Sequence, residues 1–210
     1  MRVAPYNRAV FLNCPFDDSY RPIRDAIVFT VYDAGLTPRC SLEFDDATEN
    51  RIDKIFRMIG QCRLGIHDIS RTESDPVNAL PRFNMPLELG IFLGAKRFGG
   101  RAQGGKSCLV LGREPYQYQK YLSDVAGQDA HAHHNDPKSA VAEVRGWLRT
   151  ASGRSAIPGG EEIWSRYLRF QQQLPEIGRH MKVKTEEMTF IEFSIAVDGW
   201  LRENPLTSLR

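Results

Sequence analysis

The chain has 210 residues, of which 41% are hydrophobic and 26% are charged, and its formal net charge is +2. These proportions are typical of a globular protein, and the length favours one domain with an extension. The small net charge argues against nucleic acid as the main partner. No apolar run approaches the length of a membrane span and no signal-peptide core is present, so we expect a cytoplasmic protein that does not contact a membrane.

The four cysteines, Cys14, Cys40, Cys62 and Cys108, lie far apart in apolar segments. They form no C-x-x-C pair, which argues against a redox motif or a zinc site built on cysteine. We therefore expect reduced thiols that pack as small apolar side chains in a cytoplasmic protein.

The first half of the chain alternates between apolar segments and segments with helical periodicity. Buried strands are predicted at residues 9–14, 37–42, 64–69 and 107–111, and helices at residues 20–34, 49–62 and 84–96. Continuously apolar strands that alternate with helices are typical of a parallel sheet. We predict an α/β domain over residues 1–113, with helices on both faces of this sheet.

The second half has a different character, because no convincing strand follows residue 115. Helices are predicted at residues 116–125, 138–150, 161–174 and 186–204, with Trp147, Trp164 and Trp200 as packing anchors. We predict that residues 114–210 form a helical extension packed on the α/β domain. The alternative is that part of this apolar surface serves as an interface for self-assembly or for a partner protein.

A polar loop is expected at residues 127–137, and it contains His131, His133 and His134. Aspartates flank these histidines, and both types of side chain can bind a metal ion. The spacing matches no common zinc pattern, and histidines in loops are usually solvated, so we predict no metal site.

The most unusual segment is the predicted helix that begins near Asn84. Asn84 is a suitable N-cap, and Pro86 falls in the first turn, where a missing N–H costs little. Residues 87–95 are apolar on nearly every face, which predicts a helix packed between other elements. Gly90 and Gly94 lie one turn apart, so one face would allow another backbone to approach closely.

Glu88 interrupts this apolar pattern, since it is the only carboxylate between Asp75 and Glu114. A lone acid near the start of a buried helix must be paired, neutral or functional. The ordinary explanation is that Glu88 stabilises the N-terminus of its own helix. The apolar surroundings favour the other explanation, in which Glu88 is a catalytic residue.

Polar side chains gather after the predicted strands, at the edge where an open parallel sheet binds ligands. Arginines there suit phosphate, carboxylates suit ribose hydroxyls and an aromatic ring suits a base, so we predict a nucleotide or nucleoside site. We expect Asp68, Arg82 and Asn84 to line the same cleft as Glu88. The candidate substrate-binding residues are Asn13, Phe16, Asp17, Glu43, Asp68, Ser70, Arg71, Arg82, Phe83 and Asn84.

Three common motifs are absent from the sequence. It has no G-x-G-x-x-G and no G-x-x-x-x-G-K-[ST], which excludes a dinucleotide fingerprint and a P-loop. It also has no G-x-S-x-G nucleophile elbow. A glutamate beside a ribose favours chemistry at the anomeric carbon, because a fixed carboxylate stabilises or attacks the oxocarbenium ion formed when an N-glycosidic bond breaks.

The segment N-M-P-L-E-L-G-I-F-L-G at residues 84–94 resembles the N-x-x-x-E-L-G-x-x-x-G segment of bacterial TIR-like nucleotide-binding proteins. It is also similar to the glutamate-bearing helix of nucleoside 2-deoxyribosyltransferases. The resemblance covers about residues 8–112 and includes Asp68 and the turn at residues 13–17. It implies a flavodoxin-like fold in which Glu88 acts at C1′ of a ribosyl or deoxyribosyl group.

The start of the helix favours the TIR-like group. The deoxyribosyltransferases carry an aspartate and small residues shortly before the glutamate, whereas this chain has Arg82, Phe83 and Asn84. The resemblance then implies an NAD⁺ glycohydrolase or cyclase of antiviral defence, with NAD⁺ as substrate, no other cofactor, and a homo-oligomer or a defence-system partner protein. Two alternatives stay open: a deoxyribosyltransferase or nucleotide N-glycosidase, and a non-catalytic nucleotide-binding or scaffold domain.

Overall fold

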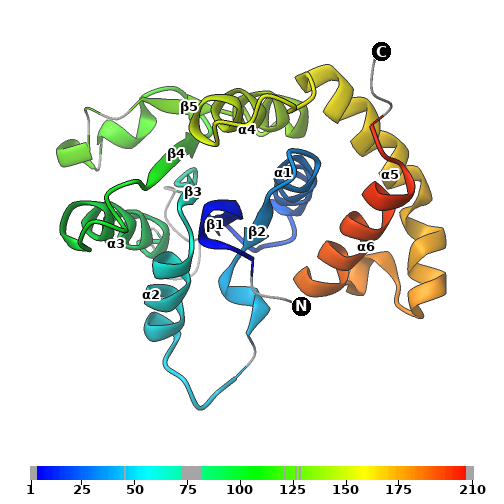
Figure 1. The fold of residues 1–210 in the computed structure, drawn as a ribbon, viewed down its shortest axis with the longest axis horizontal. Coiled ribbons are helices and arrows are strands. Elements are labelled where there is room, and N and C mark those ends of the chain that lie inside the picture. The colour runs from blue at the N-terminus through cyan, green and yellow to red at the C-terminus, as the bar shows by residue number, and fades with distance from the viewer. Residues whose placement is uncertain are drawn as a thin grey trace.

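The fold is taken from a computed structural model that describes residues 4–44, 46–71, 82–120, 122–125, 127 and 129–206. Its centre is a sheet of five strands in the order β2-β1-β3-β4-β5, and every neighbouring pair is parallel (Figure 1). This is the flavodoxin-like strand order, and the predicted α/β fold is confirmed. The strands are β1 (Ala9–Asn13), β2 (Thr37–Arg39), β3 (Leu64–Asp68), β4 (Ser107–Gly112) and β5 (Ala130–Ala132).

Helices cover both faces of the sheet. One face is covered by α1 (Arg21–Asp33) and α4 (Pro137–Ala151), and the other by α2 (Arg51–Gln61) and α3 (Asn84–Phe98) (Figure 1). Residues of β1 and β3 are fully buried, as expected for strands covered on both sides.

Two further helices, α5 (Gly160–Met181) and α6 (Phe190–Glu203), form an outer layer over α1. The ring of Phe29 in α1 lies 5.4 Å from Tyr167, 5.5 Å from Phe170 and 5.8 Å from Trp200, measured between centroids. These aromatic contacts join the C-terminal helices and the sheet domain into one hydrophobic core.

The prediction that no strand follows residue 115 is wrong. β5 pairs with β4, with Val110 opposite Ala130 and Gly112 opposite Ala132, so residues beyond 113 complete the sheet. β5 has three half-buried residues, and so short a strand leaves no apolar pattern in the sequence. In place of the helix expected at residues 116–125, the described residues form two 3₁₀ turns, Gln117–Lys120 and Ser123–Val125.

Helix α3 also differs from the prediction. It begins at Asn84 with Phe83 as the N-cap, and no side chain caps it, so Asn84 is the first helical residue and not the cap. Its outer side is open: Leu87 is 56% exposed and Phe98 is 85% exposed. The expectation that this helix is packed between other elements is therefore wrong, because the described residues leave Leu87 and Phe98 uncovered.

Within the described part of the chain, no helix combines the length and the apolar character that crossing a membrane requires.

Candidate functional site

Glu88 lies beside a pocket of about 190 Å³ between α2 and α3. Its side chain is 6% exposed, so the carboxyl is almost fully removed from bulk water. The other residues that line the pocket are Arg51, Ile52, Ile55, Asn84 and Leu87. The pocket therefore combines an apolar wall with one carboxyl group, one guanidinium group and one side-chain amide.

The electrostatics of Glu88 argue against a simple role at the helix N-terminus. Burial raises the pKa of Glu88 to about 7, and the positive charge of Arg51 opposes this shift only in part. An acid stabilised by the helix dipole would have a lowered pKa and would lie in the first turn, but α3 has no acid in its first turn. A carboxyl with a pKa near 7 exchanges its proton at neutral pH, as catalytic acids and bases do.

Asn13 fixes the start of α3 against the sheet. Its side-chain amide donates a hydrogen bond to the carbonyl oxygen of Met85 at 2.8 Å and lies 3.0 Å from Nδ1 of His67. Burial lowers the pKa of His67 to about 3, so this ring is neutral and its Nδ1 accepts the bond. Asn13 was predicted to bind substrate; the structure places it inside the protein, where its amide positions the helix that carries Glu88.

Asp68 lies in a separate buried cluster at the end of β3. The hydroxyl of Tyr20 donates to its Oδ2 at 2.5 Å, and the backbone N–H of Ser70 donates to its Oδ1 at 2.9 Å. Nε2 of His133 is 3.0 Å from the same Oδ2, and both side chains are fully buried. His133 was expected in a solvated loop, but it links β5 to the centre of the sheet.

The expected common cleft is formed only in part. Asn84 shares the pocket with Glu88, whereas Asp68 and Arg82 are not among the residues that line it. Asp68 is 0% exposed and surrounded by its own partners. Arg82 and Phe83 are exposed just before α3, and Phe83 is 65% exposed.

Asp17 and Arg71 meet at the carboxyl edge of the sheet, where the sequence placed both. Arg71 donates hydrogen bonds to Oδ1 of Asp17 at 2.7 Å and to the hydroxyl of Ser19 at 2.5 Å. Partial burial raises the pKa of Asp17, but the hydrogen bonds from Ser19 and Arg71 outweigh it and hold the pKa below its ordinary value. This pair lies at the surface, with about a third of each side chain exposed.

Glu43 and Phe16, which were predicted to bind substrate, make contacts that stabilise the fold. Glu43 lies 2.6 Å from Arg39 and accepts the N–H of Cys40 at 2.9 Å, which closes a capping box around the short 3₁₀ helix Ser41–Glu43. Burial raises the pKa of Glu43, and Arg39 opposes that shift. Phe16 is half-buried against the main core.

Arg51 is the site residue that the sequence analysis missed. It occupies the first position of α2, and its guanidinium lies 3.3 Å from the hydroxyl of Ser41. The sequence did contain an indication of its role, because the helix dipole favours acidic residues in a first turn and Arg51 is basic. The sequence did not identify Ile52 and Ile55 as pocket residues, because they fit the ordinary pattern of an amphipathic helix.

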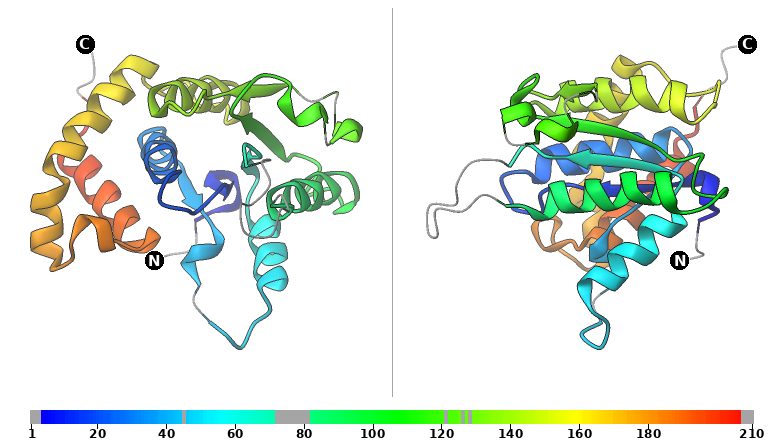
Figure 2. Two further views of the ribbon diagram at one scale, coloured as in Figure 1. Left: turned by 180° about the vertical axis from the view of Figure 1, so that it is seen from behind. Right: turned by 90° about the vertical axis from the view of Figure 1, so that its left-hand side faces the viewer.

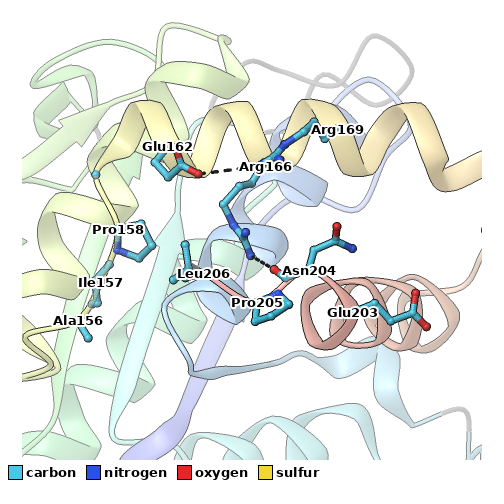
Figure 3. Close-up of a pocket in the computed structure, with 11 residues that line it drawn as sticks. Ala156, Ile157, Pro158, Glu162, Arg166, Arg169, Glu203, Asn204, Pro205 and Leu206 are labelled. Atoms are coloured by element: carbon cyan, nitrogen blue, oxygen red, sulfur yellow. Dashed lines mark hydrogen bonds and ion pairs between the residues drawn. The ribbon is translucent and has the colours of Figure 1, made fainter. Parts of the chain in front are cut away.

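A larger cavity of about 980 Å³ lies between the start of α5 and the end of α6 (Figure 3). Its arginines are already paired: Arg166 bonds to Asp33 at 3.0 Å and to the carbonyl oxygen of Asn204 at 3.0 Å, and Arg169 is 3.7 Å from Glu162. Since the buried charge of Arg166 is used within the fold and the Arg169–Glu162 pair lies at the surface, the Glu88 pocket is the better candidate site.

No protein-family model matches this sequence, and a comparison with curated proteins also finds no match. Among the residues that the structure describes, no group of three or more histidine, cysteine, aspartate or glutamate side chains is arranged to hold a metal ion.

Proposed function

We propose that this protein cleaves the N-glycosidic bond between nicotinamide and ribose in NAD⁺, as a glycohydrolase or a cyclase, with Glu88 as the catalytic residue. The observation that supports this most directly is the buried carboxyl of Glu88 beside a pocket, with its pKa raised to about 7. The resemblance of residues 84–94 to TIR-like proteins suggests both the substrate and a role in bacterial antiviral defence.

The reaction needs a negative charge where Glu88 lies. When the bond from C1′ to the pyridinium nitrogen breaks, its electron pair leaves with nicotinamide, which becomes neutral. Positive charge then develops on C1′ and the ring oxygen of the ribose, and the ionised carboxylate stabilises it. In the glycohydrolase reaction the oxygen of water bonds to C1′ and releases one proton to solvent, which leaves a C1′ hydroxyl. In the cyclase reaction a nucleophile of the same dinucleotide bonds to C1′ in place of water.

The positive charge of NAD⁺ is compatible with the raised pKa of Glu88. The pyridinium ring of NAD⁺ carries a positive charge, so its binding beside Glu88 favours ionisation and lowers the pKa of the carboxyl. Free enzyme near neutral pH therefore holds a mixture of protonated and ionised Glu88, and bound NAD⁺ selects the ionised form. Arg51, whose charge lies within reach of Glu88, is the candidate partner for a phosphate.

The size of the pocket limits what enters it. A volume of about 190 Å³ is below the roughly 300–1,000 Å³ typical of pockets for drug-sized ligands, so it accommodates one ring and not a whole dinucleotide. The apolar side chains of Ile52, Ile55 and Leu87 suit the face of an aromatic ring. The rest of NAD⁺ would lie outside the pocket, near the exposed Phe83 and Arg82.

A pocket of this size also fits a deoxyribose, so a nucleoside 2-deoxyribosyltransferase or nucleotide N-glycosidase is the second candidate. It would use the same carboxylate, as a nucleophile toward C1′. The two candidates differ in substrate, and incubation with NAD⁺ or with deoxynucleosides, followed by chromatography, separates them.

The test compares wild-type protein with Glu88→Gln and with Glu176→Gln, a control at an exposed position of α5. Nicotinamide release from NAD⁺ should fall by about 100-fold or more in Glu88→Gln, because an amide carries no charge, and stay unchanged in Glu176→Gln. Activity on deoxynucleosides alone would support the second candidate. Inactivity on both, with measurable nucleotide binding, would indicate a non-catalytic binding domain.

A further inference from the structure

Two helix N-termini and two arginines lie around the Glu88 pocket. The right-hand view of Figure 2 shows α2 and α3 side by side, and their first residues, Arg51 and Asn84, both line the pocket. Arg82 is exposed just before α3, and Asp53, in the first turn of α2, is an exposed acid. A helix N-terminus carries partial positive charge, so the positive charges around the pocket outweigh the one exposed acid.

The two helices keep their N-termini open to a ligand. The residues before them, Asn50 and Phe83, make no capping hydrogen bond through their side chains. The first N–H groups of a helix have no partner within the helix, and without a cap they can donate to an anion from outside the chain. Within the described residues, the edge of the pocket is therefore suited to a phosphate.

Ser41 fixes the guanidinium of Arg51 beside this edge. Nη2 of Arg51 donates to the hydroxyl of Ser41 at 3.3 Å, and Ser41 itself is buried. The described residues provide no carboxylate within ion-pair distance of Arg51, and its other N–H donors exceed what one hydroxyl can accept. A guanidinium placed in this way can bind a phosphate through two parallel hydrogen bonds.

The carboxyl of Glu88 is an independent indication that the pocket holds a ligand. It lines the pocket and is 6% exposed, and no described residue donates a hydrogen bond to it. Burial of a polar group is costly when no partner replaces the lost water. A ligand that carries positive charge would supply the missing interaction.

The charges of a nicotinamide nucleotide follow the same order as those of the site. Its pyridinium and ribose become the cation that Glu88 stabilises, and its 5′-phosphate is the anion that Arg51 can bind. A pocket of about 190 Å³ is smaller than roughly 300 Å³, the lower end for drug-sized ligands, so Glu88 and Arg51 lie within the span of one mononucleotide. Each substrate charge then faces a protein charge of opposite sign.

We propose that Arg51, held by Ser41, binds the 5′-phosphate of the ribose whose C1′ reacts. The substrate class is then the 5′-phosphorylated nicotinamide ribosides, and a mononucleotide is sufficient. The adenosine half of NAD⁺ lies outside the pocket and is not required. This inference rests on the proposed function, because it assigns the substrate specificity of the same site.

The first test compares nicotinamide mononucleotide with nicotinamide riboside, which differ only in the 5′-phosphate. At pH 9, above the pKa of Glu88, wild-type kcat/KM should be higher for the mononucleotide by about tenfold or more. Arg51→Ala should remove this preference by lowering only the value for the mononucleotide. Arg51→Lys keeps the charge without the paired donors and should retain part of the preference.

Two further variants separate phosphate binding from a general effect on the fold. Ser41→Ala should lower the ratio of the two kcat/KM values by less than Arg51→Ala, because Ser41 acts as a positioning residue through Arg51. Arg57→Ala is the matched control, since Arg57 is an exposed arginine of the same helix that lies 2.9 Å from Glu49 and is not among the residues lining the pocket. It should keep the wild-type ratio.

The second test measures binding by calorimetry in Glu88→Gln, with and without Arg51→Ala, so that it does not depend on turnover. Glu88→Gln should bind the mononucleotide more tightly than the riboside, and the double variant should bind both equally. This result without any cleavage of NAD⁺ would keep the inference and reject the proposed function. Cleavage of NAD⁺ with the same ratio of kcat/KM values in wild type and Arg51→Ala, or binding of neither ligand, would overturn the inference.

Discussion

The two faces of the sheet are built differently. On the α1 side, α4, α5 and α6 add further helices, and Phe29 is surrounded by Tyr167, Phe170 and Trp200. On the other side, α2 and α3 form a single layer that keeps apolar residues exposed and holds a buried acid. The first side supplies most of the core, and the second carries the groups suited to binding and chemistry.

This contrast agrees with a general division in proteins. Stability comes from well-packed layers, whereas sites tolerate unfavourable features such as a desolvated carboxyl or an open apolar surface. Changes on the α1 side should therefore affect folding, and changes on the α2–α3 side should affect function or assembly. Four experiments test this difference between the two sides of the sheet.

Truncation after Gly153 should have the largest effect. It removes α5 and α6 and exposes the core residues of α1, including Phe29, which is 0% exposed. We expect residues 1–153 to be insoluble or to lack cooperative thermal unfolding, as measured by near-UV circular dichroism and dye binding. A truncated protein that melts cooperatively would show that the C-terminal helices are an accessory layer and not part of the core.

Arg166→Ala should destabilise the protein strongly. Arg166 is 4% exposed and lies 3.0 Å from Asp33, so its loss leaves a buried carboxylate without its partner. We expect the free energy of unfolding to fall by about 3–5 kcal/mol in chemical denaturation. Arg169→Ala, at an exposed ion pair 3.7 Å long, is the control and should change it by less than about 1 kcal/mol. Similar losses in both variants would refute the role of the buried pair.

Glu88 should make stability depend on pH. Its pKa is raised from 4.5 to about 7 in the folded protein, so the folded state keeps a proton that the unfolded state releases. The resulting stabilisation is full below pH 4.5 and is lost as pH rises to about 7, a change of up to about 3 kcal/mol. Glu88→Gln should lack this loss and be the more stable protein at pH 8. An identical pH dependence in both proteins would contradict the burial of Glu88.

Arg71→Ala should have the smallest effect on stability. Arg71 pairs with Asp17 at 2.7 Å, but the pair lies at the surface and is screened by water. We expect a change below about 1 kcal/mol in the free energy of unfolding. A larger loss would show that the carboxyl edge of the sheet contributes more to the fold than its exposure suggests.

The sequence predicted the sheet because apolar segments such as residues 9–12 alternate with segments of helical periodicity, and residues 9–13 and 64–68 are buried throughout. It did not reveal β5, whose three residues are half-buried and include His131. It also overestimated the burial of α3. Local composition shows that a helix is apolar, but not which side meets the rest of the chain and which remains open.

The site was predictable only in part for a similar reason. Glu88 was recognised because an isolated acid in an apolar helix is unusual, and Asn84 was recognised from its place before that acid. Arg51 comes from a distant segment, and only the packing of α2 against α3 brings it to the pocket. Asp68 was placed at the correct edge of the sheet, but its partners Tyr20 and His133 depend on long-range contacts that have no local pattern.

We propose Glu88 as the catalytic carboxylate of an enzyme that cleaves NAD⁺. The most direct measurement is kcat/KM for nicotinamide release between pH 5 and 9, for wild-type protein and Glu88→Gln. We expect the wild-type value to rise as the carboxyl ionises through about pH 7, and the Glu88→Gln value to be lower by about 100-fold or more at pH 8. A Glu88→Gln protein that releases nicotinamide at the wild-type rate would contradict it.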